Sequence, residues 1–174
     1  LYENTIIIFA GDNGLAVGQH GLMGKQNVYE HSVGVPLMIK AAAQHTGKKT
    51  ADLCYLIDVF PTLCDMLQLP VPQSVDGISL LSSLDGKEPV RDYLYYSYMD
   101  NQRGISDGTW KLIEYHVNGK RTTQLFNLKN DPWERNDLSG QKKYEKTIQR
   151  LREKMAEEQK RTNDTSVFWN NFSY

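Results

Sequence analysis

The apolar segment from Thr5 to Ala10 constrains the fold more than any other part of the chain. It reads Thr-Ile-Ile-Ile-Phe-Ala and is ended by Gly11. A short, continuous, β-branched run of this kind predicts a buried strand, central in a parallel sheet of an α/β fold. A second apolar run covers Val33 to Ile39, but Pro36 predicts an edge strand, a bulge or a strand that starts late.

A helical pattern follows over Asp52 to Leu69, where apolar residues recur at i, i+3, i+4 and i+7. Pro61 falls inside this pattern. It predicts either a kink or a helix that starts near Val59 with proline in its first turn. The prolines of Pro70-Val71-Pro72 then end the helix.

The second half of the chain predicts an antiparallel sheet followed by a helix. Asn118-Gly119 is a strong signal for a two-residue hairpin, because both central positions of a type I′ turn need positive φ. Lys142 to about Arg161 is charge-rich with a narrow apolar stripe, which predicts a helix with one face on the sheet. The predicted strands are Tyr93 to Tyr98, about Gly104 to Ser106, Trp110 to Val117, and Thr122 to Leu128.

Composition excludes several classes of function. The chain has 20 Lys+Arg against 21 Asp+Glu, a net charge of -1, so it lacks the basic footprint of a nucleic-acid binder. No run of about 18 apolar residues predicts a membrane span. No basic segment followed by an apolar one predicts a signal peptide. The 2 cysteines, Cys54 and Cys64, cannot form a disulfide scaffold, and both are expected to be buried thiols on the helix.

The adjacent pair Asp12-Asn13 is the first candidate site. It directly follows the predicted strand, at the strand end where open α/β sheets bind ligands. Gly11 and Gly14 on either side would allow a tight turn that brings both side chains together. A carboxylate and an amide oxygen suit Ca²⁺ or Mg²⁺. The alternative is a surface turn without a ligand, because Asp-Asn-Gly turns are common.

Two further candidates lie downstream in the same Gly-rich loop. His20 stands in Gly18-Gln19-His20-Gly21, and Lys25 follows Gly24. Lys25 can present a compact positive charge to an anion. Each residue alone is also explained as a solvated loop residue.

The order of these motifs resembles the central signature of the type I sulfatase family, in the alkaline phosphatase-like superfamily. The matching segments are Thr5–Gly14, Gly18–Lys25, Tyr29-Glu30 and Val35–Leu37. More resemblance lies in Asp58–Leu63 and Asp76–Leu81, and then in Gly108–Ile113, Leu125–Leu128 and Asp131–Glu134. The resemblance spans most of residues 1 to 140.

The resemblance implies the fold and the roles of the candidates. It implies the C-terminal part of an alkaline phosphatase-like α/β sandwich over residues 1–90, with a metal and sulfate loop at 11–30. Residues 91–174 would form a small antiparallel β-sheet subdomain with a C-terminal helix. Asp12 and Asn13 would bind a divalent ion, usually calcium, while Lys25 would contact the sulfate. His20 would lie near the substrate in a less certain role.

The chain departs from the family in one respect. The family's nucleophile is a formylglycine made within a Cys/Ser-x-Pro-x-Arg motif, which does not occur here. Calcium takes about six to eight oxygen ligands, and Asp12 and Asn13 supply two or three. We therefore expect the C-terminal part of a sulfatase that is inactive alone, with an incomplete metal site.

Its expected partners are the N-terminal part of the enzyme and a sulfate ester, including sulfated carbohydrates. The strand at Thr5 to Ala10 would then expose apolar surface and favour self-association.

Two alternatives remain open at this stage. The chain could be a non-catalytic or degenerate sulfatase-like module used in binding or assembly. A phosphoester hydrolase of the same superfamily is less well supported, because two-metal sites with His-rich ligation differ from the Asp-Asn and Gly-Lys pattern.

Many relatives are exported, so export is expected although this chain carries no signal peptide. The histidines His31, His45 and His116 lack ligand-like spacing, and two formal glycosylation sequons start at Asn163 and Asn171.

Overall fold

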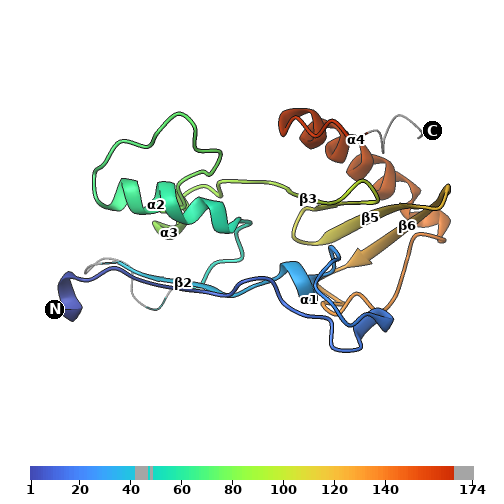
Figure 1. Cartoon of the computed structure of the whole chain (residues 1–174), viewed down its shortest axis with the longest axis horizontal. Helices are drawn as coiled ribbons and strands as arrows, with labels where there is room; N and C mark the ends of the chain where they lie inside the picture. Colours follow the sequence, from blue (N-terminus) through green and yellow to red (C-terminus); the bar gives the residue numbers. More distant parts are fainter. Residues whose placement is uncertain (42–46, 48, 167–174) are drawn as a thin grey trace. The chain divides into compact units, whose positions relative to one another are not determined.

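The computed structural model describes residues 1–41, 47 and 49–166, so His45 and the sequon at Asn171 lie outside the described residues. The chain folds as two compact units (Figure 1). One contains residues 1–12 and 35–94, and the other contains residues 13–34 and those from 95 onward. The loop at 13–34 thus clusters with the C-terminal sheet, whereas the sequence suggested a simple division after residue 90. No helix in the described ranges is long and apolar enough to cross a bilayer.

The first unit contains a two-stranded sheet, and here the expectation of a buried parallel strand is wrong. After a 3₁₀ turn at Tyr2–Asn4, β1 (Ile7–Ala10) pairs antiparallel with β2 (Leu37–Lys40). β2 starts directly after Pro36, as expected for a late-starting strand. Phe9 of β1 is 58% exposed, and Ile7 and Met38 are exposed as well. An apolar run in the sequence indicates that a strand tends to be buried, but it does not determine which strand pairs with it or in which direction. The expectation of exposed apolar surface here is confirmed.

The helix of the first unit begins where the proline allowed. A 3₁₀ turn at Leu56–Asp58 leads into α2 (Val59–Met66), so Pro61 lies in the first turn, where no backbone donor is lost. A further short helix, α3 (Leu81–Leu84), follows later in the same unit.

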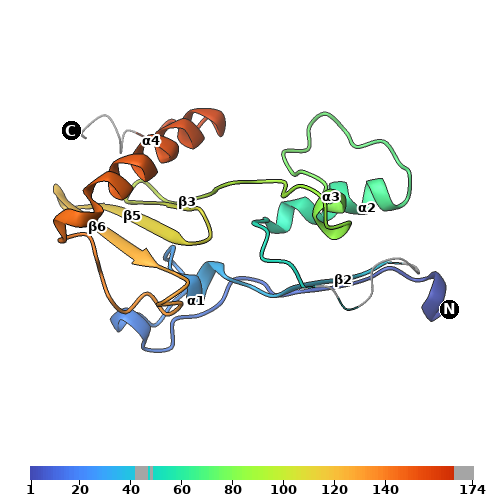
Figure 2. The same cartoon turned by 180° about the vertical axis from the view of Figure 1, so that it is seen from behind.

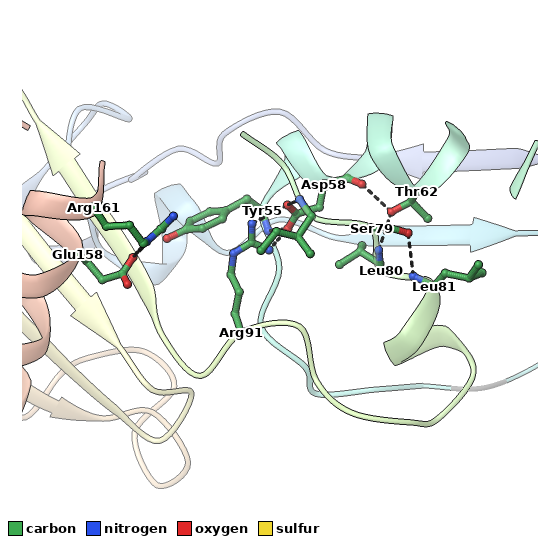
Figure 3. A network of polar contacts seen from close by, with 10 residues as sticks. Tyr55, Asp58, Thr62, Ser79, Leu80, Leu81, Arg91, Glu158 and Arg161 are labelled. Carbon is green, nitrogen blue, oxygen red and sulfur yellow. Dashed lines mark hydrogen bonds and ion pairs between the residues drawn. The ribbon is translucent and has the colours of Figure 1, made fainter. Parts of the chain in front are cut away.

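Asp58 organises the first unit around its buried carboxylate (Figure 3). Its Oδ1 accepts the backbone N–H of Ile78 at 2.8 Å, and its Oδ2 accepts that of Tyr55 at 2.7 Å. The guanidinium of Arg91 pairs with both carboxylate oxygens. Thr62, one turn along α2, donates to the Asp58 carbonyl and accepts the N–H of Leu80 at 2.8 Å. These bonds explain why the segments Asp58–Leu63 and Asp76–Leu81 occur together.

The second unit contains a four-stranded antiparallel sheet in the order β3-β4-β5-β6, as the sequence predicted. Asn118 and Gly119 connect the last two strands with φ of 52° and 73°, the positive values that a type I′ turn requires. The strands are β3 (Leu94–Tyr98), β4 (Gln102–Ser106), β5 (Trp110–Val117) and β6 (Lys120–Asn127).

One face of this sheet is covered by α4 (Glu145–Arg161), which follows a 3₁₀ turn at Lys142–Tyr144 (Figures 1 and 2). The predicted apolar stripe is confirmed, since Ile148, Leu151 and Met155 are buried. Polar bonds fix the same face. Arg152 donates to Glu114 at 2.7 Å, and Arg103 pairs with Asp164 beyond the helix end, also at 2.7 Å.

The opposite face of the sheet is covered by the loop at 13–34, which the sequence did not predict. Val28 and Tyr29 of this loop form a buried cluster with Ile113 of β5 and Phe126 of β6. The short helix α1 (Glu30–Val33) follows directly. The candidate loop is therefore packed onto the sheet.

A buried ion cluster joins the loop to the sheet at its centre. Lys111 of β5 is 0% exposed, and its Nζ lies 2.7 Å from Glu30 Oε1 and 3.1 Å from Glu134 Oε1. Glu134 is 1% exposed and also accepts the backbone N–H of Glu30 at 2.6 Å. The Lys111 Nζ stands 5.0 Å from the ring centroid of Tyr96. Lys111 thus pairs with two carboxylates that come from distant parts of the sequence.

The core contact of α4 can be tested by Leu151→Ala. Because Leu151 is fully buried, we expect a loss of about 2–5 kcal/mol in the free energy of unfolding, measured by urea denaturation. Gln149→Ala is the matched control on the exposed side of the same helix, and it should change stability by less than about 0.5 kcal/mol. Equal effects of the two variants would contradict the packing of α4.

The ion cluster can be tested by Lys111→Met. Removing the Lys111 ammonium leaves the buried Glu134 carboxylate without its partner, so we expect a loss of about 3–5 kcal/mol in the free energy of unfolding. Lys120→Met, at an exposed lysine, should be nearly neutral. The double variant Lys111→Met/Glu134→Gln should recover part of the loss, because it removes the uncompensated charge. A single variant as stable as its control would disprove the role of Lys111.

Candidate functional site

Asp12 and Asn13 lie just beyond the end of β1, with both side chains exposed. Gly11 donates its N–H to the Pro36 carbonyl at 3.1 Å, while Asn13 Nδ2 and Gly14 N both donate to the Ser32 carbonyl. Contrary to expectation, residues 11–14 form no turn. Gly14 is needed instead because the backbone of His31 passes close to it. A Cβ at position 14 would lie 1.9 Å from the His31 carbonyl oxygen.

His20 and Lys25 belong to a narrow loop whose two sides are bonded to each other. Ala16 donates its N–H to the Gly24 carbonyl at 3.0 Å, and Gly18 donates to the Leu22 carbonyl at 2.9 Å. The tip of the loop is a 3₁₀ turn at Gln19–Gly21 that carries His20, whose φ is 52°. Lys25 follows the base of the loop and is exposed. The bonded loop fixes His20 and Lys25 in one compact segment.

The imidazole of His20 is held by ring stacking. It lies parallel to the ring of Tyr29, with centroids 3.9 Å apart and planes 2° apart, and it also stacks on His31 at 5.6 Å. The Tyr29 hydroxyl donates to Gln124 Oε1 of β6 at 2.6 Å. His20 is thus fixed relative to the sheet through Tyr29, although its own side chain is exposed.

The cluster below this loop perturbs ionisation. Burial raises the pKa of the Glu134 carboxyl above its usual range, and the neighbouring Lys111 counteracts this. Burial, together with the nearby charges of His20 and Lys111, lowers the pKa of His31. His31 is therefore favoured as a neutral ring beside the cationic cluster.

An open pocket of about 570 Å³ adjoins the tip of the loop. It is lined by Gln19, His20, Trp133 and Arg135. Of these four residues, only His20 was predicted from the sequence to belong to a site. Trp133 and Arg135 could have been recognised from the sequence around the turn at Asp131–Glu134, because a Trp and an Arg flank a Glu there.

Asp12 and Asn13 are the candidate metal ligands. Asp12 and Asn13 offer oxygen atoms of the kind that calcium and magnesium prefer. Within the described ranges, no group of three or more His, Cys, Asp or Glu side chains is positioned to hold a metal ion. The donor chemistry therefore fits a hard cation, whereas the number of ligands in the described residues is too small for a complete site.

Residues 18–161 match the family described as N-sulphoglucosamine sulphohydrolase, C-terminal. An N-acetylglucosamine-6-O-sulfatase of Bacteroides thetaiotaomicron is 30% identical over 93% of this chain and 31% of its own length. The chain thus spans about a third of the length of the curated relatives that it matches.

Solved structures give the same result. BT4656, in complex with its substrate D-glucosamine-2-N,6-O-disulfate, superposes with a TM-score of 0.78 at 28% identity, covering 95% of this chain and 36% of that chain. A phosphonate monoester hydrolase of Agrobacterium radiobacter superposes with a TM-score of 0.73 at 25% identity, covering 90% of this chain and 35% of that one. The chain therefore belongs to the N-sulphoglucosamine sulphohydrolase C-terminal family, within the sulfatases of the alkaline phosphatase-like fold.

Proposed function

We propose that the native, full-length protein hydrolyses a sulfate ester of a carbohydrate, with the loop at 13–34 forming part of its active site. The observation that supports this proposal most is the anchoring of that loop. Glu30, which belongs to one of the sulfatase-like segments, is bonded to the buried Lys111 and Glu134. A loop fixed in this way can present groups to a substrate without first becoming ordered.

Each candidate residue has a distinct role in this proposal. Asp12 and Asn13 supply oxygen ligands to a divalent ion, calcium or magnesium, which when bound would polarise the sulfate oxygens. The ammonium of Lys25 offsets negative charge on the sulfate group as the ester bond breaks. The nucleophile would be a formylglycine that lies upstream of the residues described here.

The carbohydrate substrate is inferred from the names of relatives. Besides the N-acetylglucosamine-6-O-sulfatase, the matches include an N-acetylgalactosamine-6-O-sulfatase and a delta 4,5-hexuronate-2-O-sulfatase, all from Bacteroides thetaiotaomicron. Their sugars differ, so they support the class of substrate and not one particular sugar.

Activity assays of the full-length protein test the role of Lys25. Hydrolysis of glucosamine 6-sulfate and of an aryl sulfate is followed by sulfate release, with a phosphonate monoester assayed in parallel. We expect Lys25→Ala to lower kcat by about 10²–10³-fold, because a charge that stabilises the transferring group is lost. Lys129→Ala, at another exposed lysine, should leave kcat unchanged. No sulfate release from the wild type would favour the non-catalytic module, and faster phosphonate cleavage would favour the other hydrolase class.

Metal removal tests Asp12 separately. Chelation should abolish sulfate release, and added calcium should restore it. Asp12→Asn should weaken calcium binding measured by calorimetry, since it removes the one charged ligand in this part of the site. Asp65→Asn, at an exposed carboxylate of α2, is the matched control. Equal calcium affinity in both variants would contradict a ligand role for Asp12.

A further inference from the structure

The pocket lined by Gln19, His20, Trp133 and Arg135 belongs to neither the metal ligands nor the sulfate-binding lysine. It is an open pocket of about 570 Å³, a volume that a sugar ring can occupy. Two segments of the second unit form it, the tip of the loop at 16–24 and the turn at Asp131–Glu134. Both segments are fixed by contacts that do not involve a ligand.

The loop side of the pocket is rigid. His20 adopts a positive φ of 52°, which is uncommon for a residue other than glycine. Its ring rests flat on Tyr29, which is bonded to the sheet. A strained backbone supported by stacking is typical of a side chain that is held ready for binding.

The turn side is fixed by Asp131 and Glu134. Asp131 Oδ2 accepts the N–H of Asn136 at 2.8 Å, and the Asp131 carbonyl accepts that of Glu134 at 3.1 Å. Glu134 is buried against Lys111, and its two sequence neighbours are exposed. The inward glutamate thus leaves Trp133 and Arg135 on the surface.

The exposure of Trp133 has a cost that a ligand would offset. This indole is 62% exposed, although burial of a large aromatic side chain is favourable. The charge of Arg135 acts on the nearby Asp131 carboxylate, but no salt bridge joins Arg135 to a carboxylate in the described part of the chain. The nearby Asp131 carboxylate accepts backbone N–H groups of Arg135 and Asn136. The exposed indole of Trp133 and the guanidinium of Arg135 therefore line the same open pocket.

We propose that this pocket binds an anionic sugar ring of the substrate, and the proposal rests on the function proposed above. Trp133 covers the apolar C–H face of a pyranose, while the planar guanidinium of Arg135 binds a carboxylate or sulfate substituent through two parallel N–H donors. The side chains of Gln19 and His20 bond to ring hydroxyls. This assigns substrate selection to Trp133 and Arg135, at a location separate from the groups that act on the scissile sulfate.

The test measures binding of monosaccharides to the full-length protein by calorimetry. The probes are glucuronic acid, glucosamine 6-sulfate, neutral glucosamine and inorganic sulfate. We expect the wild type to bind at least one anionic sugar more tightly than glucosamine or sulfate alone. Arg135→Ala and Trp133→Ala should each weaken that binding by roughly tenfold. Trp133→Phe should retain most of it, because the aromatic face remains.

Lys120→Ala is the control for charge loss. It removes an exposed cation at the other end of β6, about 23 Å along the strand from Asn127, which precedes the turn. Its sugar affinity should equal that of the wild type. If every cation variant weakens binding equally, or if no anionic sugar binds, the proposal is wrong. The relative affinities for glucuronic acid and glucosamine 6-sulfate identify which anion Arg135 prefers.

Kinetics separate this proposal from the proposed activity. Arg135→Ala and Trp133→Ala should raise KM for an anionic sugar sulfate with little change in kcat, whereas an aryl sulfate should be hydrolysed as by the wild type. Unchanged KM in an active enzyme would overturn the pocket assignment alone. Sugar binding that depends on both residues in a protein without sulfate release would overturn the activity and leave the pocket assignment standing.

Discussion

The rest of the second unit depends on the burial of one lysine. Lys111 is the second residue of β5 and is fully buried, so its charge would be prohibitive without partners. Glu30 and Glu134 supply them from two other segments, at 2.7 Å and 3.1 Å. Lys111 and Glu134 are both fully buried, so neither charge is tolerable alone, and the partly exposed Glu30 completes the cluster. The pairing therefore specifies where the loop at 13–34 docks.

The same constraint explains why motifs far apart in the sequence occur together. Tyr29-Glu30, Trp110-Lys111 and Asp131–Glu134 each contribute one member of the ion cluster, and Glu30 precedes Lys111 by 81 positions and Glu134 by 104. Tyr29, next to Glu30, also supports His20 by stacking. A charge pair in the core is thereby linked to the orientation of a side chain at the surface.

Local signals predicted much of the sheet and the helices, and long-range pairing was harder to predict. The hairpin at Asn118-Gly119 and the helix start before Pro61 were predicted correctly, because turn dihedrals and proline sterics act within a few residues. The predicted direction and burial of β1 were wrong, since an apolar run does not specify its partner strand. Lys111 could have been recognised, because a lysine at an inward strand position requires a carboxylate. The location of Asp12 and Asn13 just beyond β1 was predicted correctly, but the expected tight turn is absent from residues 11–14. The roles of Asp12, Asn13 and Lys25 rest on resemblance and stay predictions.

The turn at Asp131–Glu134 shows how one segment can serve both stability and recognition. Glu134 must face Lys111, and its φ of 53° turns the backbone sharply at this point. The residues on either side are consequently exposed, whatever their identity, and they face no packing requirement of their own. A different side chain at the position of Trp133 or Arg135 would change the pocket without disturbing the ion cluster. Such an arrangement lets the specificity of the pocket vary while the loop that carries His20 and Lys25 keeps its anchor.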